Sequence, residues 1–162
     1  MRYEAFHTRL VPAIRWLLGI QYVLGGINWW YKILPFPTFT DDFSLPGKHP
    51  VLDAMIATGW MFASAKVIEL ATGIALLFNR YVPLLLVVAF PVALTTFIVD
   101  AFMLDDLLLW LQGAQSGAVF RAKLLDMIFF GGAVLAMHGY LMFAYFDAYR
   151  PMFGARNQAR PL

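Results

Sequence analysis

Four long apolar runs constrain the fold of this chain more than any other feature. Each holds about twenty residues, the length of helix that crosses a bilayer core about 30 Å thick. Within such a core a helix satisfies its own backbone hydrogen bonds. The runs cover residues 11–33, 55–78, 81–102 and 123–146. We therefore predict an all-α fold, a four-transmembrane-helix bundle that forms a single integral membrane domain over residues 1–162.

The composition excludes several classes of protein. Hydrophobic residues make up 61% of the chain and charged residues only 14%, whereas soluble domains carry about 25% charge. The chain has no cysteine, which excludes disulfides, thiolate metal sites and cysteine nucleophiles. Zinc-helix, phosphate-loop and serine-elbow motifs are also absent from the sequence. We predict no metal site, and the lipid bilayer is the first partner that the composition indicates.

The distribution of Lys and Arg predicts the orientation. Basic residues are in excess on cytoplasmic loops of membrane proteins. This places both termini and the tail 147–162 in the cytoplasm, and loops 34–54 and 103–122 outside. The same distribution accounts for the basic pI without nucleic-acid binding. We expect a multi-pass protein of a bacterial-type inner (cytoplasmic) membrane. The basic residues on the predicted inner side are Arg2, Arg9, Arg15, Arg80, Arg150, Arg156 and Arg160.

Two opposite charges lie in the middle of the second run. Lys66 and Glu69 are three residues apart, a spacing at which helical side chains can reach each other. An ion at bilayer depth costs roughly 2.5–3.5 kcal/mol on insertion scales unless it pairs or faces an interior. Lys66 also shares a face with small residues such as Gly59 and Gly73, which suits close helix packing. The pair is either a neutralising contact that stabilises the bundle or part of a functional site.

Polar residues recur on the predicted inward faces of the other helices. Helical spacing and depth put Asn28, Lys32, Asp100 and Asp126 in the outer third, and Gln21 near the midplane with the ion pair. We expect a polar pocket reached from the outer leaflet. Its candidate binding residues are Gln21, Asn28, Lys32, Trp60, Lys66, Glu69 and His138, and its candidate proton-handling or quinone-contacting groups are Glu69, Lys66, Lys32, Asp100 and Asp126.

Several of these residues also have a purely structural interpretation. His138 is the one histidine inside a predicted span, so bis-histidine haem and a metal site lack a second ligand, and a packing role is favoured. Asp100 and Asp126 would pair with Lys32 and Lys123 at the interface, or else carry protons or contact a substrate. The apolar stretch 107–111 is too short to span. It would lie on the outer leaflet, cap the bundle or dock another protein.

Short motifs in the first two helices resemble the DoxX-like family of integral membrane proteins. They are Arg15-Trp-Leu-Leu-Gly19 followed by Gly26 and Lys32, and Glu69-Leu-Ala-Thr-Gly73 followed by a short positive turn at Asn79-Arg80. The resemblance implies a compact four-helix membrane bundle and a place in redox biology. Some members are membrane subunits of thiosulfate:quinone oxidoreductase. By this resemblance, Glu69 and Lys32 are the positions to watch.

Three functional hypotheses remain open at this point. The first is a non-catalytic accessory subunit of a larger membrane redox or energy-converting complex, associated with other membrane subunits or with copies of itself. The second is a quinone-binding membrane subunit of an oxidoreductase, in which a lysine donates to a quinone carbonyl and carboxylates handle protons. The third is a small transporter or lipid-binding protein that uses the same cavity.

Overall fold

A computed structural model describes residues 2–31, 33, 49–101 and 104–153 of the chain. Over this part of the chain the structure is helical and contains no strand. The elements are α1 (Arg2–Tyr31), α2 (His49–Ala57), α3 (Met61–Phe78), α4 (Val82–Asp100), α5 (Leu104–Leu111), α6 (Gly117–Asp126), η1 (Met127–Gly132), α7 (Ala133–Ala144), α8 (Phe146–Tyr149) and η2 (Arg150–Phe153).

Within the described residues, four helical stretches are long and apolar enough to cross a membrane. They are Arg9–Tyr31, Met61–Phe78, Gly117–Ala144 and Val82–Leu111, the last of which comprises α4 and α5 and runs over residues 102–103, which are not described. Large apolar side chains on these helices point away from the protein, among them Phe78, Leu84 and Phe143, and a bilayer supplies the partner that such side chains need. The prediction of an all-helical fold with four helices able to span a membrane is therefore confirmed. Residues 34–48 of the first predicted loop and 154–162 of the tail lie outside the described part.

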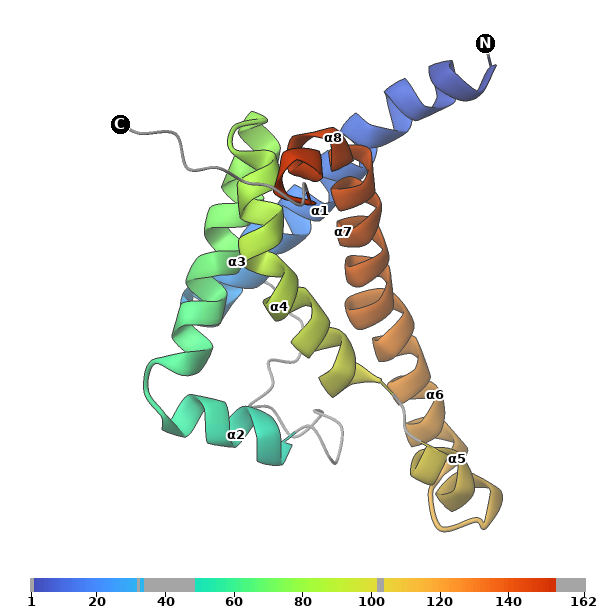
Figure 1. The fold of residues 1–162 in the computed structure, drawn as a ribbon. Coiled ribbons are helices and arrows are strands. Elements are labelled where there is room, and N and C mark those ends of the chain that lie inside the picture. Colours follow the sequence, from blue (N-terminus) through green and yellow to red (C-terminus); the bar gives the residue numbers. More distant parts are fainter. Residues whose placement is uncertain (1, 32, 34–48, 102–103, 154–162) are drawn as a thin grey trace.

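The second predicted span, 55–78, is divided into two helices at residues 58–60. The Thr58 hydroxyl donates to the Met55 carbonyl at 2.6 Å and accepts from the Met61 amide at 3.0 Å. One side chain thus ends α2 and begins α3. Gly59 has φ +77°, which glycine adopts without strain. Because of this corner, the helix that is long and apolar enough to span begins at Met61, and α2 lies across the end of α3 (Figure 1).

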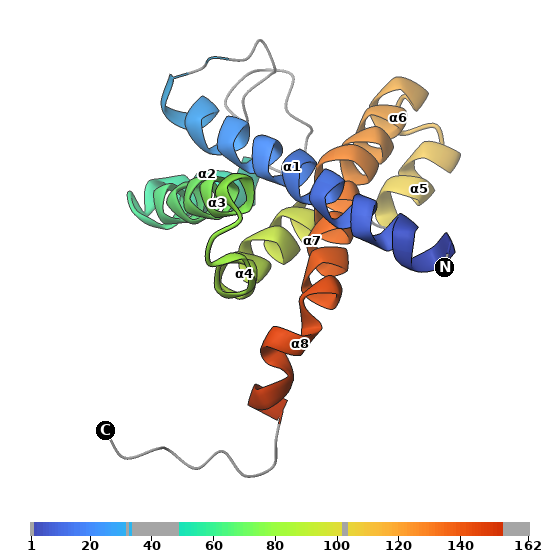
Figure 2. The same cartoon turned by 90° about the horizontal axis from the view of Figure 1, so that it is seen from above.

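Glycines bring α1 and α3 into close contact. A Cβ added at Gly73 would lie 2.8 Å from the Gly19 carbonyl oxygen and from the Val23 amide nitrogen, and one at Gly26 would lie 3.0 Å from the Cβ of Leu70. Backbones approach this closely only where side chains are missing. Seen from above, α1 crosses both α3 and α7 (Figure 2). The small residues predicted for helix packing therefore serve that role at Gly73, whereas Gly59 is exposed.

The buried core lies at the end of the bundle where the helices converge (Figure 1). Its side chains come from α1, α3, α4 and α7, namely Leu18, Tyr22, Leu76, Val82, Leu86, Val134 and Leu141. The Tyr149 hydroxyl donates to the Pro83 carbonyl at 2.9 Å and closes this end. Burial, with a smaller contribution from Tyr145, raises the pKa of Tyr149, so its hydroxyl stays a donor at neutral pH.

The last span is longer than predicted and carries a helical hairpin. From Gly117 to Ala144 it has 28 residues, a length of about 42 Å at 1.5 Å per residue. It begins in the predicted loop 103–122, where α5 packs against α6. Lys123 pairs with Asp106 at 2.6 Å, and the rings of Trp110 and Phe120 stack 4.9 Å apart. The segment 107–111 is thus part of a short helix, and Lys123 pairs with Asp106, a partner that was not expected.

Candidate functional site

The ion pair predicted on the second span is formed within α3. The Lys66 ammonium donates to Glu69 Oε2 at 2.8 Å, and the two side chains are only 12% and 11% exposed. The ammonium also lies 5.3 Å from the centroid of the Phe62 ring, an arrangement in which the ring face attracts the cation. A carboxylate and an aromatic ring thus surround a charge that would otherwise be costly at this depth.

A pocket of about 250 Å³ opens beside this ion pair, between α2, α3 and α4. Most of its wall is apolar, and its polar groups come from Lys66, Glu69, Ser64 and two threonines of α4. A small apolar pocket with a few convergent polar groups is the usual form of a ligand site, and this volume is just below the typical range. The lining residues are Leu52, Met55, Met61, Phe62, Ser64, Ala65, Lys66, Ile68, Glu69, Pro91, Val92, Thr95, Thr96 and Val99.

A second polar cluster joins three helices around His138. The ring is fully buried, with Nε2 2.8 Å from the Leu86 carbonyl oxygen and Nδ1 2.9 Å from the Tyr22 hydroxyl. A carbonyl can only accept, so Nε2 carries the proton, and Nδ1 accepts from the tyrosine. Both ring nitrogens are therefore occupied, and His138 connects α7 to α1 and α4. In this arrangement it serves as a packing histidine and offers no nitrogen to a cofactor.

The two clusters adjoin along one face of α1. A Cβ added at Gly25 would lie 3.8 Å from Glu69 Oε2, so the carboxylate lies against α1 one turn beyond Tyr22. The polar interior thus runs from the pocket at Lys66 to the histidine near the converging end. Sequence spacing predicts such an interior face but not its partners.

The remaining predicted residues are distributed around this interior. Gln21 and Asn28 are partly buried on α1. Lys32 lies outside the described residues, as do the side chains of Asp100 and Asp126. Trp60, predicted near the pocket, is 66% exposed at the start of α3. Among the described residues, no group of three acidic, histidine or cysteine side chains could hold a metal ion.

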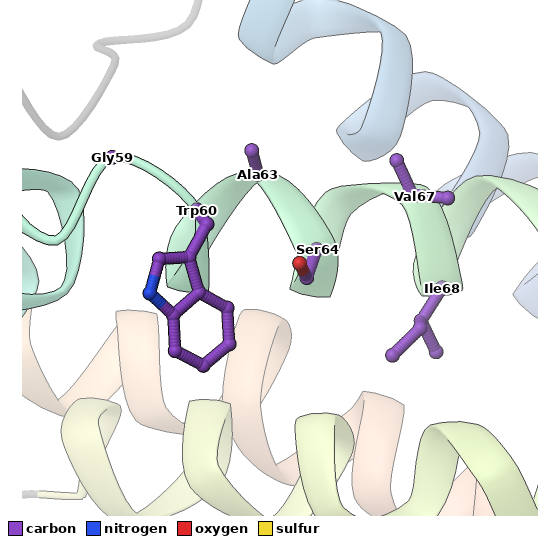
Figure 3. Close-up of a pocket in the computed structure, with 6 residues that line it drawn as sticks. All are labelled: Gly59, Trp60, Ala63, Ser64, Val67 and Ile68. Carbon is purple, nitrogen blue, oxygen red and sulfur yellow. The ribbon is translucent and has the colours of Figure 1, made fainter.

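Trp60 lines a second hollow on the outer side of α3. This open groove of about 450 Å³ is formed by Gly59, Trp60, Ala63, Ser64, Val67 and Ile68, and Figure 3 shows these side chains along one turn after another of the helix. Ser64 and Ile68 line both the groove and the pocket. The groove and the pocket therefore meet at the edge of α3 that carries these two residues.

Two buried residues escaped the sequence analysis. Tyr22 is 5% exposed and donates to His138, and Thr72 is fully buried with its hydroxyl 3.4 Å from the Leu85 carbonyl oxygen. An intramembrane hydroxyl needs a partner, so a tyrosine on the first helix could have been matched with the one histidine inside a span. Comparison with known protein families, curated proteins and solved structures finds no match to this chain.

Proposed function

We propose that this protein binds a lipid-soluble ligand of the quinone class in the pocket beside Lys66 and Glu69. One observation carries the proposal. The ion pair lines a cavity, whereas a purely structural pair would be enclosed by packed side chains. The Lys66 ammonium is a donor for a quinone carbonyl, and the apolar wall formed by α2 and α4 suits an aromatic head group.

In this role the chain is the membrane subunit of an oxidoreductase. Reduction of a quinone to a quinol takes two electrons and two protons. The electrons come from a redox centre on another subunit, and this chain holds the quinone and handles protons. Glu69 lies within hydrogen-bond reach of Lys66 and is the group that would relay a proton to the bound ring.

The proposal agrees with the resemblance to the DoxX-like family. Of the motif Glu69-Leu-Ala-Thr-Gly73, the carboxylate lines the pocket and Gly73 packs against α1. The excess of Arg at the N-terminus, at Arg80 and in the tail supports cytoplasmic termini. These features favour a protein of a bacterial-type inner membrane that works beside a soluble or membrane redox partner.

A second candidate is an accessory subunit without chemistry of its own. It is favoured by the α5–α6 hairpin, which lies at the far end of the last span (Figure 1) and exposes Leu104, Leu108 and Leu111. Such a surface could dock a larger subunit. Gentle extraction from native membranes followed by mass spectrometry distinguishes the two. Redox subunits at fixed stoichiometry without bound quinone favour the accessory role.

The direct test is quinone binding by the purified protein in lipid nanodiscs. A short-chain ubiquinone should bind saturably to the wild type, and Lys66→Gln or Glu69→Gln should weaken binding at least tenfold, about 1.4 kcal/mol. Lys123→Gln is the matched control, because it removes a lysine from an ion pair outside the pocket. Unchanged binding in both pocket variants, or no saturable binding by the wild type, would overturn the proposal.

A further inference from the structure

The groove and the pocket lie on two sides of α3 and share one edge. The groove side of the helix is open, with Trp60 66% and Val67 55% exposed, whereas the pocket side carries the buried residues Phe62 and Glu69. Ser64 and Ile68 belong to both linings. A molecule that fills the pocket and continues past these two residues therefore comes to lie in the groove.

We propose that the groove binds the hydrocarbon tail of the ligand whose head lies in the pocket. This inference rests on the proposed function and adds a second subsite to it. The pocket, at about 250 Å³, has room for a head group but not for a long chain as well. The groove runs from Gly59 to Ile68, a length of about 13 Å at 1.5 Å per residue.

The groove has the chemistry that a tail requires. Its wall is mostly apolar, and Gly59, Ala63 and Ser64 have side chains too small to fill it. The Trp60 indole stands at one end as a large, flat wall (Figure 3). Trp60 and Val67 of this wall are exposed on a helix long and apolar enough to span, so in a bilayer the hollow would open to lipid. The ligand would then reach the pocket sideways, across Ser64 and Ile68.

The expected contribution of the tail is modest. A tail that leaves the groove passes into lipid, which is equally apolar, so the groove adds packing contacts but no hydrophobic transfer energy. Each pair of packed heavy atoms adds only a small attraction. We therefore expect the groove to strengthen binding of a long-tailed ligand by about fivefold to tenfold, corresponding to roughly 1 kcal/mol.

The test fills the groove and varies the length of the tail. Val67→Trp places an indole in the groove, and Val67 does not line the pocket. The matched control is Ile74→Trp, which makes a similar change at a position 45% exposed and two turns further along α3. Dissociation constants are measured in nanodiscs for a ubiquinone with one isoprene unit and for one with ten.

The inference predicts that Val67→Trp weakens binding of the long-tailed quinone about fivefold to tenfold and leaves the short one unchanged. Ile74→Trp should alter neither. Equal binding of both quinones by Val67→Trp and the wild type would overturn the tail subsite, as would an equal loss for both quinones. Neither of these two results would contradict binding of the head group in the pocket. Failure of the wild type to bind either quinone overturns the proposed function itself, and the tail subsite with it.

Discussion

At the scale of single residues, the hydrogen bonds of His138 determine how three helices meet. Its Nε2 donates to the Leu86 carbonyl, and its Nδ1 accepts from Tyr22. Both partners are deep in the bundle, where water cannot replace them. A buried donor or acceptor that loses its partner costs about 1–3 kcal/mol. Removal of a single oxygen atom from this cluster should therefore lower the stability of the protein measurably.

We expect Tyr22→Phe to destabilise the protein by about 1–3 kcal/mol, because it leaves the His138 Nδ1 without a donor. The measurement is thermal unfolding in detergent, followed by circular dichroism. Tyr31→Phe is the control, since Tyr31 is 76% exposed and should lose little. Equal stability of Tyr22→Phe and the wild type would show that this hydrogen bond contributes nothing to the fold.

The ion pair of α3 allows a separate prediction. Replacing one member of a buried pair leaves an uncompensated charge and typically costs about 3–5 kcal/mol, whereas replacing both by apolar residues can be nearly neutral. Lys66→Met and Glu69→Met should each lower the unfolding temperature, and the double variant should recover most of the loss. Quinone binding should fail in all three. Additive losses in the double variant would contradict the coupling of the pair.

The sequence predicts the ion pair of α3 but not the contacts of His138. The Lys66–Glu69 contact could be foreseen because both residues lie on one helix, where spacing determines proximity. The contact between Tyr22 and His138 joins residues 116 positions apart. Helical periodicity indicates which face of each helix is polar, but not which faces meet or at what depth. That information depends on how the helices pack.

At the scale of elements, glycine at position 73 sets the distance between α1 and α3. An added methyl group would meet the Gly19 carbonyl oxygen and the Val23 backbone at 2.8 Å. Backbone atoms cannot move aside as a flexible side chain can. This close contact between α1 and α3 therefore has no room for a larger side chain at position 73.

Gly73→Ala should destabilise the protein by about 1–3 kcal/mol, the usual cost of overpacking. Gly139→Ala is the matched control, because a Cβ at Gly139 meets nothing within 4 Å. It should be neutral or slightly stabilising, since alanine favours a helix. Unfolding temperatures of the two purified variants give the comparison. Equal tolerance of both substitutions would mean that α1 and α3 are not in tight contact.

The hairpin of α5 and α6 gives a prediction about membrane depth. Leu108 is exposed on a face of α5 that also carries Leu104 and Leu111, and Asp105 is exposed at the edge of that face, about 60° around the helix from Leu108. We expect Leu108 to face the lipid boundary and Asp105 to face water, as on an interfacial helix. The chain has no cysteine, so spin labels at Leu108→Cys and Asp105→Cys need no background substitutions.

Accessibility of these labels to oxygen and to a water-soluble nickel complex decides the matter. The label at position 108 should be more accessible to oxygen than to the nickel complex, and the label at position 105 should be more accessible to the nickel complex. Low access to both reagents at position 108 in native membranes would instead indicate a protein partner on this face. Predominant nickel access at both positions would place the hairpin in water.

The elements themselves were partly predictable. Long apolar runs predict spanning helices because lipid demands internal hydrogen bonding. The corner at Thr58 was missed because residues 55–57 continue the apolar pattern of the span that follows. The α5–α6 hairpin was not predicted, because it is held by the pairs Asp106–Lys123 and Trp110–Phe120. These pairs join two short segments, and nothing in the sequence of either segment indicates that they pack together.

At the scale of the whole molecule, the charge distribution predicts orientation. Arg80 lies in the turn between α3 and α4, and Ala114 lies in the turn between α5 and α6. If the basic side faces the cytoplasm, a membrane-impermeant maleimide applied to intact cells should label Ala114→Cys and not Arg80→Cys. Permeabilised cells should label both. The reverse pattern would place both termini outside.

The convergence of the helices at one end has a further consequence for how the chain can vary. One end of the bundle is held together by the His138 cluster, the Tyr149–Pro83 hydrogen bond and the shared core. The other end carries α2, the pocket and the α5–α6 hairpin. Variation accumulates where neighbours can readjust. Homologous chains should therefore diverge in a gradient along the bundle, and new ligand preferences should arise at the open end without loss of the fold.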